Sequence, residues 1–156
     1  MEELKPFITN EYCLRCQGCC RFAEEKSCWA PHLLTEETKT IAPFSKVIAL
    51  QTNPGQGNFI CQFLNPGDNK CNVYPHRPFE CKLYPFLINR QGKKVYLSVD
   101  LKCPYIKKNV HIEEYKRYVQ YLTAFFNNPA HLNILRANPQ IVQTYDNVLY
   151  ISEIKL

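Results

Sequence analysis

The chain has 156 residues, of which 46% are hydrophobic and 13% aromatic, so it has the size and apolar content of one ordinary domain rather than of a mini-protein held together by disulfides. Nine cysteines are more than a cytoplasmic chain of this length would carry by chance. They are explained either by disulfides or by bound metal. The net charge of +5 comes with no stretch that is apolar enough for a membrane span.

The amino terminus predicts that the cysteines stay reduced. Two acidic residues precede its first lysine and no apolar run follows, which excludes a secretory signal in this segment. We therefore expect a cytoplasmic protein, in which clustered thiolates are metal ligands rather than disulfides. The odd number of cysteines also argues against complete pairing.

In chain order, the first predicted element is a short helix that starts after Thr35, runs towards Ala42 and ends at Pro43. Residues 47–50 and 58–64 predict two strands, and residues 94–99 predict a third. The turn at 53–57 contains two glycines, but it lacks the third glycine of a phosphate loop and predicts a hairpin.

Helical spacing begins at Ile112, where apolar residues recur every three or four positions up to Pro129. A second helix at 130–138 and a strand at 147–154 follow. The fold class predicted from these elements is α+β. We expect a single small domain over residues 1–156, with irregular cysteine-rich metal-binding loops in a ligand-bearing part, 13–103, and a helical C-terminal part, 110–156.

The leading motif is Cys13-x2-Cys16-x2-Cys19-Cys20, two overlapping units whose spacing lets a tight loop direct sulfurs at one metal. Bacterial ferredoxins use a similar run with a distant Cys-Pro, which Cys103-Pro104 resembles. Neighbouring side chains diverge on strands and helices, so Cys19 and Cys20 are expected to be awkward co-ligands of one ion, and one of them is free to serve a second centre.

Three further cysteines, Cys61, Cys71 and Cys81, follow at ten-residue intervals. Pro78 favours a helical start that brings Cys81 to a positive helix end, where its thiolate would be stabilised. The expected metal and cofactor ligands are Cys13, Cys16, Cys19, Cys20, Cys61, Cys71, Cys81 and Cys103. Soft thiolates suit an iron-sulfur cluster, of the 4Fe-4S type, or zinc, and we place iron-sulfur first.

Together these motifs resemble the CxxCxxCC, or YkgJ-type, cysteine-cluster family, which is proposed to chelate zinc or iron. The matching segments are Cys13 to Cys20, Cys61-x-Phe63-Leu64, Cys71-x2-Tyr74-Pro75-x-Arg77-Pro78-x2-Cys81-x2-Tyr84-Pro85-Phe86, and Cys103. The family is similar to part of the flagellin lysine-N-methylases, which implies redox chemistry or methyl transfer to a protein lysine. The chain is short for such an enzyme, so whether it is an enzyme stays open and no catalytic residue is assigned.

Outside the motifs, Cys28 is expected to be a buried apolar thiol, and the four histidines are expected to be surface or hydrogen-bonded residues rather than ligands. Tyr74 and Tyr84 are expected to shield the metal site. Arg77 is expected either to donate to a sulfur or a bound anion, or to pair with a surface carboxylate.

Residues 70–117 contain eleven basic residues against four acidic ones, which is typical of a solvated basic face. The alternative function is a structural zinc module that uses this stretch to bind an acidic protein or nucleic acid. Nucleic acid is the weaker form, because the basic residues do not alternate with exposed aromatic ones. Metal ions are the expected partners, a protein partner or substrate is left open, and no membrane is expected.

Overall fold

The computed structural model describes residues 4–16, 18–42 and 45–156, and it combines helices with antiparallel sheets. This confirms the α+β class. The chain forms two compact units: Ile8–Lys82, here the cysteine unit, and Met1–Phe7 with Leu83–Leu156, here the sheet-helix unit. Within the described part of the chain, no helix combines the length and the apolar character that crossing a bilayer requires.

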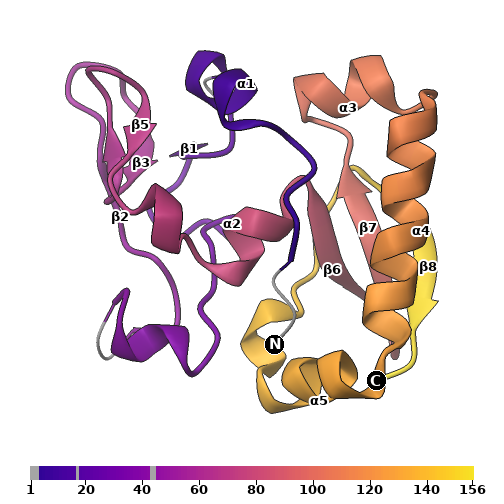
Figure 1. The fold of residues 1–156 in the computed structure, drawn as a ribbon. Coiled ribbons are helices and arrows are strands. Elements are labelled where there is room, and N and C mark those ends of the chain that lie inside the picture. The colour runs from indigo at the N-terminus through magenta and orange to yellow at the C-terminus, as the bar shows by residue number, and fades with distance from the viewer. Residues whose placement is uncertain (1–3, 17, 43–44) are drawn as a thin grey trace. The chain divides into compact units, whose positions relative to one another are not determined.

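The cysteine unit consists of short elements, which are drawn from indigo to magenta in Figure 1. They are α1 (Asn10–Arg15), β1 (Arg21–Phe22), η1 (Glu37–Lys39), β2 (Leu50–Thr52), β3 (Phe59–Cys61), β4 (Leu64–Asn65), β5 (Lys70–Cys71), η2 (Tyr74–His76) and α2 (Phe79–Leu83), which ends at the unit's border. Strands β1, β3 and β2 form an antiparallel sheet in that order, and β4 pairs with β5. Every element is too short to have a core of its own.

The predicted hairpin forms, since β2 pairs with β3 from Leu50↔Cys61 to Thr52↔Phe59, but its first strand is displaced and shares only Leu50 with the predicted strand 47–50. Gly55 and Gly57 in its turn have φ angles of 73° and 64°, the left-handed region that glycine adopts without steric cost. The turn therefore needs glycine for its backbone shape, as expected of a hairpin rather than of a phosphate loop.

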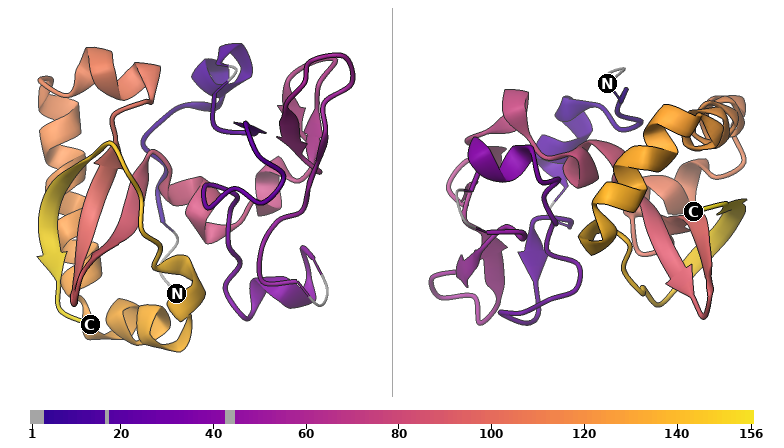
Figure 2. Two further views of the ribbon diagram at one scale, coloured as in Figure 1. Left: turned by 180° about the vertical axis from the view of Figure 1, so that it is seen from behind. Right: turned by 90° about the horizontal axis from the view of Figure 1, so that it is seen from below.

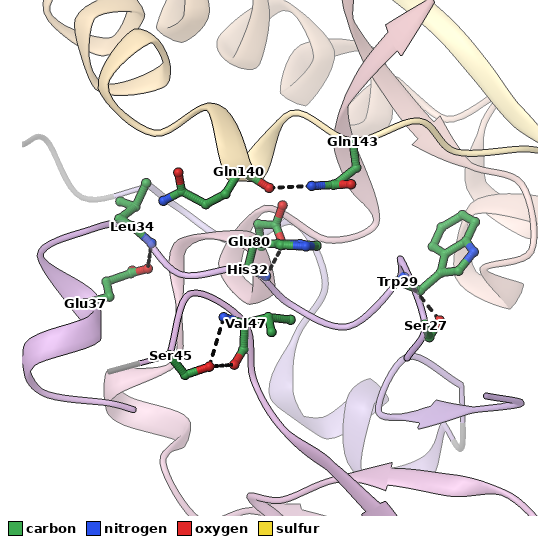
Figure 3. Close-up of polar contacts among 10 residues, drawn as sticks. All are labelled: Ser27, Trp29, His32, Leu34, Glu37, Ser45, Val47, Glu80, Gln140 and Gln143. Atoms are coloured by element: carbon green, nitrogen blue, oxygen red, sulfur yellow. Dashed lines mark hydrogen bonds and ion pairs between the residues drawn. The ribbon is translucent and has the colours of Figure 1, made fainter. Parts of the chain in front are cut away.

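The predicted helix after Thr35 is shorter than expected, because only the 3-10 turn η1 forms. The carboxylate of Glu37 connects this turn to another part of the chain. It accepts the backbone N–H of Leu34 at 2.9 Å, as Figure 3 shows, and that of Phe79 at 2.7 Å. Glu37 thus joins this turn to the start of α2. Pro43, the predicted end, lies outside the described residues.

The sheet-helix unit contains the antiparallel sheet β6 (Phe86–Gln91), β7 (Lys94–Asp100) and β8 (Val148–Ile154), in that order. Its helices are α3 (Pro104–Asn109), α4 (Glu113–Asn127) and α5 (Pro129–Ala137), and the 3-10 turn η3 (Pro139–Ile141) follows. Figure 1 shows α4 lying along one face of the sheet, and Figure 2 shows the same sheet from behind. The predicted strands at 94–99 and 147–154 and both predicted helices are confirmed.

The core of this unit lies between α4 and the sheet. Leu122 and Phe126 from α4 are almost fully buried, as are Leu97 and Val99 from β7. The ring of Phe7 packs at 5.8 Å from that of Phe86, so the amino-terminal segment is part of this core. The helical spacing read from the sequence thus identified the face of α4 that is buried.

Candidate metal centre

The leading motif lies at the end of a helix and in the turn that follows. Cys13 lies within α1, and Cys16 is its C-cap residue, with its N–H donating to the carbonyl of Tyr12 at 3.0 Å. A Cβ atom at Gly18 would lie 3.4 Å from Sγ of Cys16, so the glycine leaves room for that sulfur. Cys19 and Cys20 then lead into β1.

The sulfurs of Cys19 and Cys20 are 4.0 Å apart, which contradicts the expectation that these neighbours diverge. The reason is local structure: both residues lie in a turn, where the side-chain directions of strands and helices do not apply. Two thiolates on one tetrahedral zinc, with bonds of about 2.3 Å, lie about 3.8 Å apart. The two sulfurs therefore already have the spacing of co-ligands of a single ion.

The downstream cysteines lie where short elements end. Cys61 is the last residue of β3, and its N–H donates to the carbonyl of Cys20 at 3.1 Å, which ties it to the leading motif. Cys71 is the last residue of β5, and Cys81 lies in the single turn of α2. As predicted, a helix begins after Pro78.

Backbone amides point at two of these sulfurs. The N–H groups of Phe63 and Leu64 donate to the sulfur of Cys61 and lower its pKa, and the N–H of Val73 acts in the same way on Cys71. Hydrogen bonds from the amides that follow a cysteine are how metal-binding loops stabilise a thiolate. Both segments therefore have the local geometry of thiolate ligands.

Burial nevertheless keeps most of these thiols protonated in the absence of metal. Loss of solvation raises the pKa of Cys61 to about 11, and it also raises the pKa of Cys71 and of Cys81. The pKa of Cys19 is raised mainly by its contact with Cys20, whose own pKa the same contact lowers. The expected stabilisation of the Cys81 thiolate by the helix end is wrong, because desolvation dominates there.

Several of these sulfurs lie near enough for the charge of one thiolate to act on the pKa of another. Cys20 raises the pKa of Cys61, Cys71 and Cys81, and Cys13 and Cys81 raise that of Cys19. Six of the predicted ligands thus interact through their charges within one unit, and Cys16 lies on the same loop. All nine cysteines carry thiols rather than disulfides. Soft donors of this kind fit zinc or iron.

The sulfurs lie in one unit, but they do not surround a common metal position. In the described part of the chain, no three histidine, cysteine, aspartate or glutamate side chains stand close enough to hold an ion as they are placed. Binding of a metal therefore requires the loops to draw the sulfurs further inward. The thiols are donors of the type that zinc and iron take.

Positive charge beside the sulfurs comes from two arginines. Arg21 and Arg77 each lower the pKa of Cys20, and Arg77 also lowers that of Cys71. The guanidinium of Arg77 lies over the ring of Tyr74, 4.3 Å from its centre, which holds it in place. Arg77 therefore acts on the sulfurs electrostatically, while its expected hydrogen bond to a sulfur or a bound anion stays a prediction.

Cys103 lies in the other unit. It is 4% exposed and is the N-cap residue of α3, and its N–H donates to the carbonyl of Asp100. Its role as a ligand stays a prediction. Tyr84 belongs to the same unit, where its hydroxyl donates to the carboxylate of Asp100 at 2.8 Å.

Cys28 is exposed, so its expected burial as an apolar thiol is wrong. It lies in a run of turns between β1 and the buried Ala30, which contains no helix or strand with a buried side. In this run the hydroxyl of Ser27 accepts the backbone N–H of Trp29 (Figure 3). One histidine side chain makes the predicted hydrogen-bonded contact: Nδ1 of the buried His131 lies 2.8 Å from the carbonyl of Phe125. At His32 it is the backbone N–H that donates to the carboxylate of Glu80, at 2.6 Å (Figure 3).

Asn69 is a residue that the sequence analysis missed. Its side-chain amide contacts three carbonyls of the leading motif, although 53 to 56 residues separate them in the chain. The only local signal is its place in the turn-forming run Pro66-Gly67-Asp68-Asn69, which indicates a tight turn but not a distant partner.

Comparison with curated proteins and with solved structures gave no match. A family model, CxxCxxCC, described as a "putative zinc- or iron-chelating domain", matches residues 12–104, more than half of the chain. The matched segment contains all of the sulfurs described above. The chain therefore belongs to the CxxCxxCC family.

Proposed function

We propose that this protein binds a metal centre through the thiolates of its cysteine unit. The proposed ligands are drawn from Cys13, Cys16, Cys19, Cys20, Cys61, Cys71 and Cys81, with Cys103 as the remaining predicted one. One observation carries the proposal: the sulfurs of Cys19 and Cys20 lie 4.0 Å apart, and the backbone N–H of Cys61, at the end of a different element, donates to the carbonyl of Cys20 at 3.1 Å. Buried thiols placed together in this way repel one another once ionised, and a bound cation removes that repulsion.

An iron-sulfur cluster is the form that we place first. Three cysteines at C-x2-C-x2-C spacing are typical of clusters, and amide hydrogen bonds to the sulfurs, as at Cys61 and Cys71, stabilise them. The seven predicted ligands in this unit also exceed the four that a single tetrahedral ion takes, which leaves room for a cluster beside a separate ion.

Zinc is the second candidate, and the spacing of Cys19 and Cys20 favours it. Their sulfurs at 4.0 Å fit two bonds to one ion, whereas a cluster distributes its thiolates over different irons. The protein would then be a structural module. Ion pairs already balance Lys94, Lys102, Lys116 and Arg117, so the basic stretch itself favours a solvated face over a polyanion site.

Purification without oxygen, followed by metal analysis and a visible spectrum, separates the two forms. Brown protein that contains iron and acid-labile sulfide supports the cluster. Colourless protein with stoichiometric zinc supports the module. Protein that retains neither metal, and takes up neither after reconstitution, contradicts the proposal.

Replacing one sulfur tests the ligand set. Cys16→Ser removes a thiolate from the leading loop while keeping the size of the side chain, so we expect it to lose most of the bound metal and to unfold at lower denaturant. Cys28→Ser is the matched control, because its thiol is exposed and lies outside the motifs, and it should keep the wild-type metal content. Full metal content in Cys16→Ser would contradict the assignment.

Redox or group-transfer activity, such as methyl transfer to a protein lysine, goes further and stays a prediction. Such chemistry requires an open coordination position at the metal. We expect added cyanide to shift the visible spectrum of the loaded protein if that position exists. An unchanged spectrum would leave a closed structural centre, which contributes folding energy and needs no substrate access.

A further inference from the structure

Asn69 lies in the turn that joins β4 to β5, and its backbone has a φ of 58°, in the left-handed region. Its side-chain Nδ2 donates to the carbonyl of Leu14 at 2.7 Å, to that of Cys16 at 2.9 Å and to that of Cys13 at 3.2 Å. One amide group therefore holds the segment that carries the first two sulfurs of the leading motif.

These three carbonyls lie at the end of α1, where the last carbonyls of a helix have no partner within the helix. Glycine residues and local turns usually satisfy such groups. Here a side chain from a distant hairpin does so. Because α1 has only six residues, it is too short to be stable by itself, and its position depends on contacts of this kind.

The orientation of the Asn69 amide is fixed from its other side. Nη1 of Arg21 donates to Oδ1 of Asn69 at 2.8 Å, and a guanidinium can only donate, so the oxygen faces Arg21 and the nitrogen faces the carbonyls. Arg21 directly follows Cys20 and lowers its pKa. A single side chain thus connects segments that bear Cys13, Cys16, Cys20 and Cys71.

We propose that Asn69 is a positioning residue for the metal centre, which holds the Cys13–Cys16 segment against the hairpin that carries Cys71. This inference rests on the proposed function. Before metal binds, the clamp orders a segment that would otherwise lose conformational entropy on binding, so it raises affinity by preorganisation. Loss of residues that orient metal ligands typically lowers affinity about 10- to 100-fold.

Two variants remove the clamp in different ways. Asn69→Gly deletes the amide and keeps the left-handed backbone without strain. Asn69→Asp keeps an acceptor for Arg21 but places a carboxylate against three carbonyls. The matched control is Asn147→Gly, since Asn147 is the other described asparagine with positive φ, at 54°, and lies in the sheet-helix unit.

The first measurement is the affinity for Co²⁺ alone, followed through the thiolate-to-cobalt absorption bands of protein purified without metal. We expect Asn69→Gly and Asn69→Asp to bind about 10- to 100-fold more weakly than the wild type, and Asn147→Gly to bind normally. Wild-type affinity in both Asn69 variants would overturn the inference, while metal binding itself would stand.

The second measurement needs no metal. Alkylation of the metal-free protein, read by mass spectrometry, should label Cys13 and Cys16 faster in the Asn69 variants, with the exposed Cys28 as internal reference. Equal acceleration at Cys81 would indicate general loosening of the unit and would overturn the positioning role. A wild type that binds no Co²⁺ and takes up neither zinc nor an iron-sulfur cluster on reconstitution contradicts the proposed function, and the labelling then still shows whether the clamp orders its segment.

Discussion

At the scale of single residues, the sulfurs of Cys61, Cys71 and Cys81 are held in an environment that favours the neutral thiol. Cys61 shows this most clearly, because loss of solvation raises its pKa from 9.0 to about 11 although two backbone amides act in the opposite direction. The neighbouring Cys20 and Cys71 raise it further. A metal ion reverses this balance by taking the place of the protons.

This pKa predicts how the metal-free protein responds to alkaline pH. The unfolded chain loses the Cys61 proton near its ordinary pKa of 9.0, whereas the folded chain keeps it up to about 11. The contribution of Cys61 to the free energy of unfolding is therefore fully present below pH 9, and it is lost as the pH rises towards 11. We expect Cys61→Ser to reduce this loss by roughly 1–2 kcal/mol, less than the full shift because the thiol is partly exposed.

Denaturant unfolding at pH 8 and pH 10.5 in the presence of a reductant and a chelator measures the effect. Cys28→Ser is the control and should retain the wild-type dependence, since its thiol is exposed in the folded state. An identical loss of stability in Cys61→Ser and the wild type would show that the Cys61 thiol does not contribute.

At the scale of elements, long-range side-chain contacts hold pieces that are too short to be stable alone. Glu37 in η1 is the clearest case, because its two carboxylate oxygens accept backbone N–H groups from Leu34 and from Phe79, at the first residue of α2. Desolvation raises the pKa of this carboxyl in spite of both hydrogen bonds.

We expect Glu37→Gln to destabilise the protein by about 1–3 kcal/mol. A glutamine side chain has one acceptor oxygen, so one of the two buried N–H groups loses its partner. Glu36→Gln is the matched control, because Glu36 is the exposed neighbour and its replacement should change stability by less than about 0.5 kcal/mol. Equal stability of the two variants would contradict the role given to Glu37.

Helix α4 is held by apolar packing instead. Leu122 is fully buried in the sheet-helix unit, so we expect Leu122→Ala to cost about 2–5 kcal/mol in the free energy of unfolding. Gln120→Ala, at an exposed position of the same helix, should have little effect. Chemical denaturation of the metal-free variants measures both, and a small loss in Leu122→Ala would mean that the helix does not anchor this core.

The elements that the sequence predicted are those whose pattern is local and long. Helix α4 repeats apolar residues at helical spacing over four turns, and the turn at Gly55 and Gly57 leaves its own signature. Strand β6 was missed because Phe86 to Asn89 is a continuous buried run without alternation. After Thr35 only the 3-10 turn Glu37–Lys39 forms, although the local sequence has the start signal of a longer helix.

The same distinction applies to the metal centre. The spacing of the cysteines predicts which sulfurs are candidate ligands, because metal binding requires that residue type at short intervals. The approach of Cys19 and Cys20 was not predictable from rules for strands and helices, since both residues lie in a turn. Asn69 carries no signal of its own, because its role exists only once the hairpin and α1 have come together.

At the scale of the whole molecule, the two units are stabilised by different means. The sheet-helix unit has a paired three-stranded sheet and a helix whose apolar face is buried, which is the ordinary basis of a stable core. The cysteine unit has strands of two or three residues and one-turn helices, and it contains seven of the eight predicted ligands. We therefore expect bound metal to stabilise the cysteine unit far more than the sheet-helix unit.

Hydrogen exchange measured by mass spectrometry, with and without a chelator, tests this division on the full chain. We expect metal removal to lower the protection of residues 8–82 strongly, because closed thiolate sites contribute folding energy outright. Amides of β6, β7 and α4 should remain protected, since β6 pairs with β7 and the buried face of α4 belongs to the core of the sheet-helix unit. Equal loss of protection in both units would mean that the metal, and not the sheet with its helix, holds the entire chain in its fold.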